Sequence, residues 1–360
     1  MTTTSKKVLF LFPELAGYIV SCMKQLAAEP GLEVHVVRWP VNAIAPFEFR
    51  LDDAEDLYFY NRNDLDDQAL MELTSKLNPD IIFCSGWIDK GYVAVCRQFY
   101  GKVKTVVTFD NPWRGTLKQQ AAAIGGSIYL RNKFSHCWVC GSPQKEFALK
   151  LGFRENRIRE GFYSCDYNHF HDLYELNRKN KEQDFPKRFL FVGRYTKLKG
   201  ALELWDAFIE FTSDEQHKDW ELWCLGKGEY EGRFPDHPAI KDHGFVQPEQ
   251  INDIIKETGV FILPSHYEHW GVVVHEFAAA GMPLLCTTTT GAATTFLDEG
   301  VNGYFLEPES TGSIVEGFRK IAALDSRELI KMGDASARIA ERITPEKWVE
   351  VVWQYLNEKN

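Results

Sequence analysis

The 360-residue sequence contains no run of about 18 or more apolar residues, so it predicts no membrane-spanning helix. Its first segment, MTTTSKKVLFLFPEL, has a short apolar run and no small-residue cleavage site, which favours a first β-strand over a secretory signal. A phosphate loop of the form GxxxxGK[ST] is also missing, as is any internal repeat of roughly 20–50 residues. These absences argue against a membrane-spanning helix, a P-loop NTPase and a solenoid.

The sequence also lacks a second cysteine pair. Its one CxxC, Cys137-Trp-Val-Cys140, therefore has no partner with which to complete a zinc site. The strand-like context of this motif would send the two thiols to opposite faces. Most of the eight cysteines stand in apolar segments, where cysteine acts as a small buried hydrophobe. We expect reduced thiols and, from them, a cytoplasmic protein.

Acidic residues outnumber basic ones, 51 to 41, but the excess is uneven. Residues 1–164 hold 20 Lys and Arg against 18 Asp and Glu, whereas the remainder holds 21 against 33. Residues 102–159 contain 11 basic and only 3 acidic side chains. This bias predicts contact of the first domain with an anionic acceptor or a membrane surface, with solvated helix faces as the alternative. Nucleic acid is not an expected partner.

Strand-like and helix-like segments alternate along the chain. In the first half, strand candidates such as KKVLFLF and KTVVTFD are apolar on both faces, as in a doubly wound parallel sheet. A second alternation runs from RFLFVGRY to NGYFLEP and ends in helices. Ligands of such sheets bind at the carboxyl ends of the strands. We therefore predict an α/β protein with two Rossmann-like domains, residues 1–165 and 188–342, a polar linker over 166–187 and a final helical segment over 343–360.

Two cations follow the first strand of the second half. In FVGRYTKLKG, Gly193 turns the chain, and Arg194 and Lys199 stand in a strand-to-helix loop. Arginine binds phosphate bidentately and lysine as a point charge, so the pair fits a diphosphate. Surface charges near a helix start are the alternative, but helix N-termini favour anions. Further on, Gly226 and Gly228 would let a nucleotide approach the backbone closely.

The stretch SHYEHWGVVVHEFAAAGMP, residues 265–283, follows a buried strand. A helix is expected to begin near Gly271 and to end at Gly281. The N–H groups of Gly271, Val272 and Val273 would then be free to bind an anion such as a diphosphate.

Two glutamates, Glu268 and Glu276, flank this anion site. Glu276, inside the helix, would accept hydrogen bonds from the two hydroxyls of a ribose. Glu268, in the loop, would face sugar hydroxyls beyond the phosphates. His266, His269 and His275 suggest zinc as an alternative, but HYEHW has neither the HExxH nor the HxxEH spacing. We therefore predict a sugar-nucleotide site without a metal.

The order of these motifs resembles the donor half of the GT-B retaining glycosyltransferases, and is most similar to family 4. The resemblance runs over about residues 188–320, through GR-x4-KG, LWCLGKG, HGFV, the two glutamates, TTGA and EGVNGYFLEP. It implies a UDP-, GDP- or ADP-sugar as the donor. It also implies these roles: Arg194 and Lys199 on the donor phosphates, Glu276 on the ribose, Glu268 on the transferred sugar, and backbone around Val246 beside the base.

The first half resembles the family less, as expected of an acceptor domain. Where members often carry a glycine pair near the donor phosphates, FPELAGYI keeps only Gly17. Where they often carry a His-Asp pair, TVVTFDNPWRG has Phe109, which leaves Asp110 or Asn111 as the polar group facing the reacting sugar. The last helix, EKWVEVVWQYL, would cross back to cover the first domain.

The resemblance implies hexosyl transfer with retention and without a metal or other cofactor, because cations and helix N-termini stabilise the leaving diphosphate. The acidic stretches LDDAED and DLDDQ are expected to be surface loops. We predict a glycosyltransferase of polysaccharide biosynthesis that uses a glycan or lipid-linked acceptor. A phosphorylase or an epimerase of the same fold, and a nucleotide-sugar-binding protein without turnover, stay open as alternatives.

Overall fold

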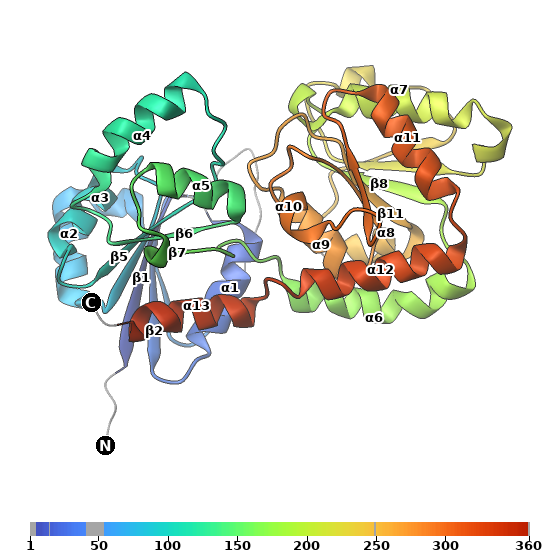
Figure 1. Ribbon diagram of the computed structural model, residues 1–360. Helices are drawn as coiled ribbons and strands as arrows, with labels where there is room; N and C mark the ends of the chain where they lie inside the picture. The colour runs from blue at the N-terminus through green and yellow to red at the C-terminus, as the bar shows by residue number, and fades with distance from the viewer. Residues whose placement is uncertain (1–4, 14, 41–53, 248–249, 359–360) are drawn as a thin grey trace. The chain divides into compact units, whose positions relative to one another are not determined.

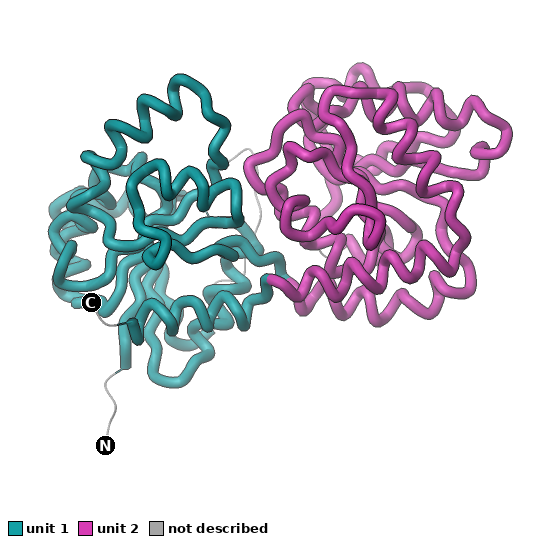
Figure 2. The backbone as a smooth tube through the Cα atoms, in the orientation of Figure 1, with its two compact units in different colours: residues 1–166, 343–360 teal, residues 167–342 magenta. Residues whose placement is uncertain are grey.

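The computed structural model describes residues 5–13, 15–40, 54–247 and 250–358. The chain forms two compact units, one built from residues 1–166 and 343–360 and the other from residues 167–342 (Figure 2). The final segment, residues 343–360, belongs to the first unit. Among the described residues, no helix combines the length and apolar character that crossing a bilayer requires.

The first unit is a parallel sheet with helices on both faces (Figure 1). Alternate residues of its first strand are buried on opposite faces: Leu9 and Leu11 join one core cluster, while Phe10 stacks on Phe83 and on Trp348. Both faces are covered, so the central strands are apolar throughout. The strand order is β3 (Leu57–Asn61), β2 (Leu32–Arg38), β1 (Lys6–Phe12), β4 (Ile81–Ser85), β5 (Lys104–Phe109), β6 (His136–Val139) and β7 (Ile158–Arg159).

The helices of the first unit include the C-terminal one as part of the core. Trp348 donates from its indole nitrogen to the Phe162 carbonyl at 2.8 Å, and the Tyr355 hydroxyl donates to the Cys137 carbonyl at 2.9 Å. Burial raises the pKa of the Cys137 thiol well above its usual range. The eight cysteines are all free and buried. The helices are α1 (Gly17–Ala27), α2 (Asp67–Leu77), α3 (Lys90–Phe99), α4 (Leu117–Leu130), α5 (Ser142–Lys150) and α13 (Pro345–Asn357).

The acidic stretch DLDDQ is not a loop throughout. Asp66 is the N-cap of α2, its carboxylate accepting from the Ala69 N–H at 2.7 Å, and Asp67 is the first helical residue. An aspartate at this place satisfies an N–H group that the helix itself leaves unpaired. Of the other acidic stretch, LDDAED, residues 51–53 lie outside the described residues.

The second unit repeats the architecture with a six-stranded parallel sheet. Helices α7 and α11 pack together, and α12 packs with α6 and α9. The strand order is β10 (Ile240–Gly244), β9 (Glu221–Leu225), β8 (Arg188–Val192), β11 (Val260–Leu263), β12 (Leu284–Thr287) and β13 (Gly303–Leu306). The helices are α6 (Tyr167–Gln183), α7 (Ala201–Thr212), α8 (Ile251–Glu257), α9 (Val272–Ala279), α10 (Ala293–Phe296), α11 (Thr311–Ala322) and α12 (Ser326–Ala340).

The segment 166–187, expected to be a polar linker, contains helix α6. Its polar side chains include Arg178, which binds Asp334 of α12 through two hydrogen bonds of 2.8 Å each. The Tyr174 hydroxyl donates to the same carboxylate at 2.9 Å. A bidentate arginine–carboxylate pair fixes geometry as well as adding energy, so these residues attach α6 to the second unit.

One lysine of α6 is buried without a counter-charge. Lys181 is 5% exposed, and its ammonium nitrogen has no hydrogen-bond partner among the described residues. Burial lowers the pKa of Lys181 from 10.5 to about 7. The unfolded chain therefore binds more protons than the folded one between about pH 7 and pH 10.5, and stability rises with pH through this window.

We expect Lys181→Met to raise the free energy of unfolding at pH 7 by about 2–3 kcal/mol, because the variant buries no ionisable group. The advantage of the variant should shrink as the pH rises towards 10, where the unfolded lysine also loses its proton. Urea unfolding at several pH values measures both effects. Lys179→Met on the exposed side of the same helix is the matched control. A variant less stable than the parent at pH 7, or an advantage independent of pH, would contradict the prediction.

Candidate functional site

The predicted donor site lies at the carboxyl edge of the second sheet, where all the strands end at the same side. The loops after β8 and β9 are bonded to each other: the Gly193 N–H donates to the Leu225 carbonyl at 3.0 Å, and the Tyr195 N–H to the Lys227 carbonyl at 3.0 Å. Gly226 has a φ of +149°, and a Cβ atom there would lie 2.0 Å from the Gly193 carbonyl oxygen. Only glycine fits, so the glycine of LWCLGKG serves the packing of the two loops.

Arg194 and Lys199 stand in the loop between β8 and α7, as predicted. Arg194 is exposed, and Lys199 ends a short 3-10 turn, Lys197–Lys199, directly before α7. The ammonium group of Lys199 forms an ion pair with the carboxylate of Glu268, and both side chains are about four-fifths buried, at 18% and 20% exposure. Partial burial weakens the screening of such a pair by solvent. The structure thus joins two residues that stand 69 positions apart in the chain.

Glu268 is held in place through its backbone. Its N–H donates to the Thr289 carbonyl at 3.3 Å, and its carbonyl accepts from the Gly291 N–H at 3.2 Å. The threonine loop after β12 is itself fixed by the Thr287 hydroxyl, which donates to the Ser265 carbonyl at 2.6 Å. Sequence reasoning did not assign a role to these threonines. Their signal was TTTTG directly after an apolar strand, a composition typical of loops built on side-chain-to-backbone hydrogen bonds.

Helix α9 begins where it was expected. Gly271, at a φ of +85°, is its N-cap and supplies no side-chain hydrogen bond. Val272 and Val273 form the start of the first turn and are partly exposed. A helix start without a side-chain cap leaves N–H groups for an outside acceptor. An ideal Cβ atom on Gly271 would lie 2.9 Å from the Glu268 Cγ atom, so this helix start and the Lys199–Glu268 pair are neighbours.

Glu276 lies on α9, one turn beyond the helix start, and is partly exposed. The residue before it, His275, is fully buried, stacks on Phe296 at 3.9 Å between ring centroids, and lies with Nε2 at 2.9 Å from the Ala340 carbonyl. His275 therefore has a packing role.

Val246, predicted to flank a base, follows β10 and is partly exposed.

The other histidines of this stretch also have local partners. His266 is 8% exposed, and its Nε2 atom lies 3.2 Å from a carboxylate oxygen of Glu203. The ring of His269 packs edge-on against the ring of Tyr267, with 5.2 Å between the ring centroids. The described part of the chain contains no group of three or more His, Cys, Asp and Glu side chains placed to hold a metal ion.

The remaining predicted residues belong to the first unit. Gly17 is exposed at the first position of α1. Phe109 ends β5 in the core, with ring centroids 5.7 Å from those of both Trp87 and Phe147. Asp110 follows directly, partly exposed, and its backbone carbonyl accepts from the Gln144 amide at 2.9 Å. Where a polar side chain was expected from the resemblance, Phe109 therefore adds to the packing of the first unit.

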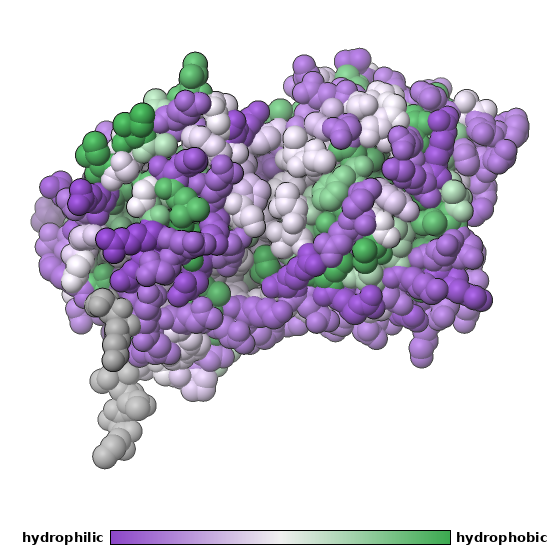
Figure 3. Space-filling view, in the orientation of Figure 1, coloured by the Kyte–Doolittle hydropathy of each residue, from purple (hydrophilic) through white to green (hydrophobic). Residues whose placement is uncertain are grey.

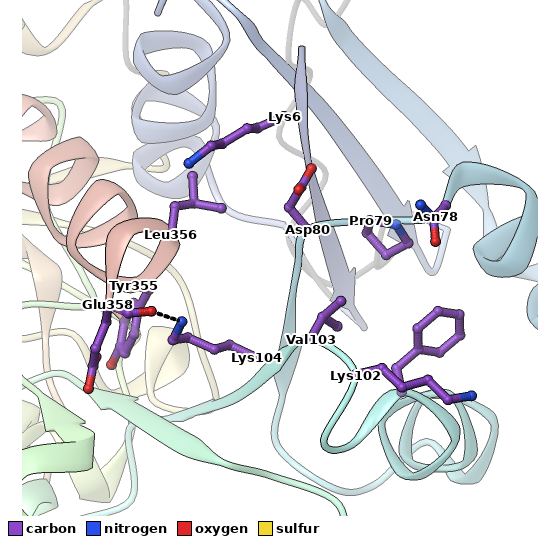
Figure 4. A pocket seen from close by; sticks show the side chains of 11 residues that line it. Lys6, Asn78, Pro79, Asp80, Lys102, Val103, Lys104, Tyr355, Leu356 and Glu358 are labelled. Atoms are coloured by element: carbon purple, nitrogen blue, oxygen red, sulfur yellow. Dashed lines mark hydrogen bonds between the residues drawn. The ribbon is translucent and has the colours of Figure 1, made fainter. Parts of the chain in front are cut away.

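A separate cavity of about 460 Å³ lies at the amino edge of the first sheet (Figure 4). It is lined by side chains that precede or begin β1, β4 and β5 and by the end of α13, among them Lys6, Asp80 and Lys104. The Lys104 ammonium group donates to the backbone carbonyl of Glu358. None of the residues predicted for sugar-nucleotide binding lines this cavity.

A family model described as glycosyl transferases group 1 matches residues 174–338. The chain is 30% identical over 263 residues to an uncharacterized glycosyltransferase of Methanocaldococcus jannaschii. The alignment covers 67% of this chain and 66% of the relative, so it spans just under two thirds of the relative's length.

Two solved structures are similar over nearly their whole length. A glycosyltransferase from Rickettsia africae superposes with a TM-score of 0.75 at 15% identity, covering 99% of this chain and 100% of the other. HepE of Anabaena, in complex with UDP and glucose, superposes with a TM-score of 0.71 at 14% identity, covering 98% and 99%. At these identities the likeness establishes the fold. The predicted fold class, GT-B, is therefore confirmed.

Proposed function

We propose that this protein, whose residues 174–338 match the family model of glycosyl transferases group 1, moves a sugar from a nucleoside diphosphate to an acceptor hydroxyl. The observation that carries the proposal is the Lys199–Glu268 pair beside the uncapped start of α9. A cation, a carboxylate and free N–H groups at one sheet edge match a ligand that has both phosphates and hydroxyls. The complex of HepE with UDP and glucose supports a UDP-sugar as the first donor to test, with a GDP-sugar second.

We assign the proposed roles of the site residues from their charges. Arg194, Lys199 and the N–H groups of Gly271, Val272 and Val273 neutralise the diphosphate as it leaves. Glu268 accepts hydrogen bonds from the transferred sugar, and Glu276 accepts them from the ribose. Because protein cations stabilise the leaving group, the reaction needs no divalent metal. Addition of EDTA should therefore leave the rate unchanged.

We propose that transfer proceeds with retention. The bond between the anomeric carbon and the phosphate oxygen breaks, and the acceptor oxygen forms its bond on the same face of the sugar. The acceptor proton passes to an oxygen of the departing diphosphate, so no protein base is required. Asp110 of the first unit is the candidate group near the reacting sugar, in place of the histidine that Phe109 replaces. A glycan, free or lipid-linked, is the proposed acceptor.

The test is a donor and acceptor screen followed by NMR of the product. UDP- and GDP-sugars are first ranked by the thermal shift they produce, and the best is then offered with glycan and lipid-linked acceptors. We expect a product whose anomeric configuration equals that of the donor. An inverted product would refute retention while leaving the transfer itself intact. Donor binding without slow hydrolysis or transfer to any acceptor would instead favour a nucleotide-sugar sensor.

A further inference from the structure

Helix α4 of the first unit packs inward with small residues. A Cβ atom on Gly126 would lie 2.7 Å from a terminal methyl group of Leu151 in the neighbouring chain segment, so the glycine lets this side of the helix pack closely. Ala123 and Ser127 are partly buried next to it, and Leu130 at the end of the helix is 3% exposed. The contacts of α4 with the unit therefore do not use most of its large aliphatic side chains.

Those aliphatic side chains face solvent instead. Leu117, Ile124 and Ile128 are 83%, 74% and 78% exposed, and Ala121 between them is exposed as well. The four residues stand at spacings of four, three and four, which places them on one side of a helix. Figure 3 shows hydrophobic side chains along α4 at the surface of the first unit. We call these four residues the α4 stripe.

The sequence around the α4 stripe is basic. Between Asp110 and Glu146 the sequence contains no acidic residue, although the whole chain has a net charge of −10. The five basic residues of this interval are Arg114, Lys118, Arg131, Lys133 and Lys145. Lys118 lies on α4 beside the first residue of the stripe, and Arg131 caps the helix; both are exposed. The stripe thus has cations at both of its ends and no carboxylate nearby in sequence.

We propose that α4 is a docking element for an anionic lipid bilayer, with the α4 stripe inserted among the lipids and the flanking cations on the headgroups. An interfacial helix of this kind needs an apolar side and neighbouring Lys or Arg, and both are present. A second copy of the chain is a poorer occupant, because symmetric pairing would bring two sets of cations together. The proposal does not depend on glycosyl transfer, since it concerns a surface of the first unit alone.

Vesicle sedimentation with the full chain tests this. We expect the protein to pellet with vesicles of phosphatidylcholine containing phosphatidylglycerol, and to be released by raised salt because the headgroup contacts are ionic. The variant Leu117→Ser, Ile124→Ser, Ile128→Ser should bind these vesicles at least about tenfold more weakly. The control replaces two exposed apolar residues elsewhere, Leu176→Ser and Val301→Ser, which are 62% and 54% exposed.

The outcomes separate the possible occupants. Equal pelleting of the stripe variant and the parent, or pelleting of neither, would overturn the proposal. A dimer in solution that the stripe variant loses, without vesicle binding by the parent, would assign the stripe to self-association instead. The stripe variant must retain the unfolding midpoint of the parent, which its exposed positions predict. Loss of vesicle binding with unchanged transfer to a water-soluble acceptor would support docking and leave the proposed function standing.

Discussion

Replacing Lys199 with alanine is expected to lower kcat about 10²–10³-fold, because the variant loses a positive charge that stabilises the departing diphosphate. In the structure its ammonium group is paired with Glu268, and the pair is about four-fifths buried. The carboxylate thereby holds the ammonium group at the sheet edge before any donor arrives. A charge positioned in advance costs little reorganisation during the reaction, so its removal should affect kcat more than donor KM.

The matched control for this variant is Lys197→Ala. Lys197 lies in the same 3-10 turn, is exposed, and has no ion pair among those found in the described chain. Its loss should change kcat by less than about twofold. Steady-state kinetics at several donor concentrations separates kcat from KM. Equal kinetics for Lys199→Ala and Lys197→Ala would contradict the assignment of Lys199 to the leaving group.

The Lys199–Glu268 pair also predicts that the two residues are coupled. Alanine at either position leaves the other charge, about four-fifths buried, without its partner, so the two single substitutions each carry a cost that the double variant avoids. The free energies of unfolding of the two single variants should therefore sum to a larger loss than the double variant shows. If the losses in free energy of unfolding of the two single variants instead add up to the loss of the double variant, the two side chains are not coupled and the prediction is wrong.

Strand positions were the most predictable part of the fold. Segments such as KKVLFLF and VFILPS are apolar on both faces, and β1 and β11 occupy them. The short edge strands β3 and β7 were not anticipated. Edge strands carry fewer core contacts, and LYFYN of β3 mixes exposed and buried positions. Helix α4 was also not anticipated, because its aliphatic residues do not mark a buried face.

For the site, the order of strands and loops in the sequence was enough to place Lys199 and Glu268 at the carboxyl edge of the second sheet. It was not enough to show that the two side chains form an ion pair. The pattern after the buried strand correctly located a helix start near Gly271, between Glu268 and Glu276. Only the folded chain shows that Lys199 reaches Glu268, since the pairing of β8 with β11 brings their loops together. Likewise, only the resemblance to the family marks Phe109 as unusual, and its packing on Trp87 and Phe147 explains why an aromatic ring fits there.

Glu276→Ala is expected to raise donor KM about 100-fold with a small effect on kcat. A carboxylate that accepts from both ribose hydroxyls makes two charge-assisted hydrogen bonds, each contributing about 1.5–3 kcal/mol. The ribose is remote from the breaking bond, so this binding energy is present equally in the ground state and the transition state. Uniform binding of this kind appears in KM and not in kcat.

Glu276→Gln and Glu210→Ala complete this test. The amide keeps one acceptor oxygen without the charge, so Glu276→Gln should fall between the parent and the alanine variant in donor KM. Glu210 is exposed on α7 and serves as the control for loss of a glutamate from a helix of the same unit. A 2′-deoxyribose donor lacks one of the two hydroxyls, so its KM with the parent should lie between that of the natural donor with the parent and that of the natural donor with Glu276→Ala, and it should show no further loss in that variant. If the deoxy donor instead loses affinity equally for both proteins, the ribose is held elsewhere and Glu276 has a structural role.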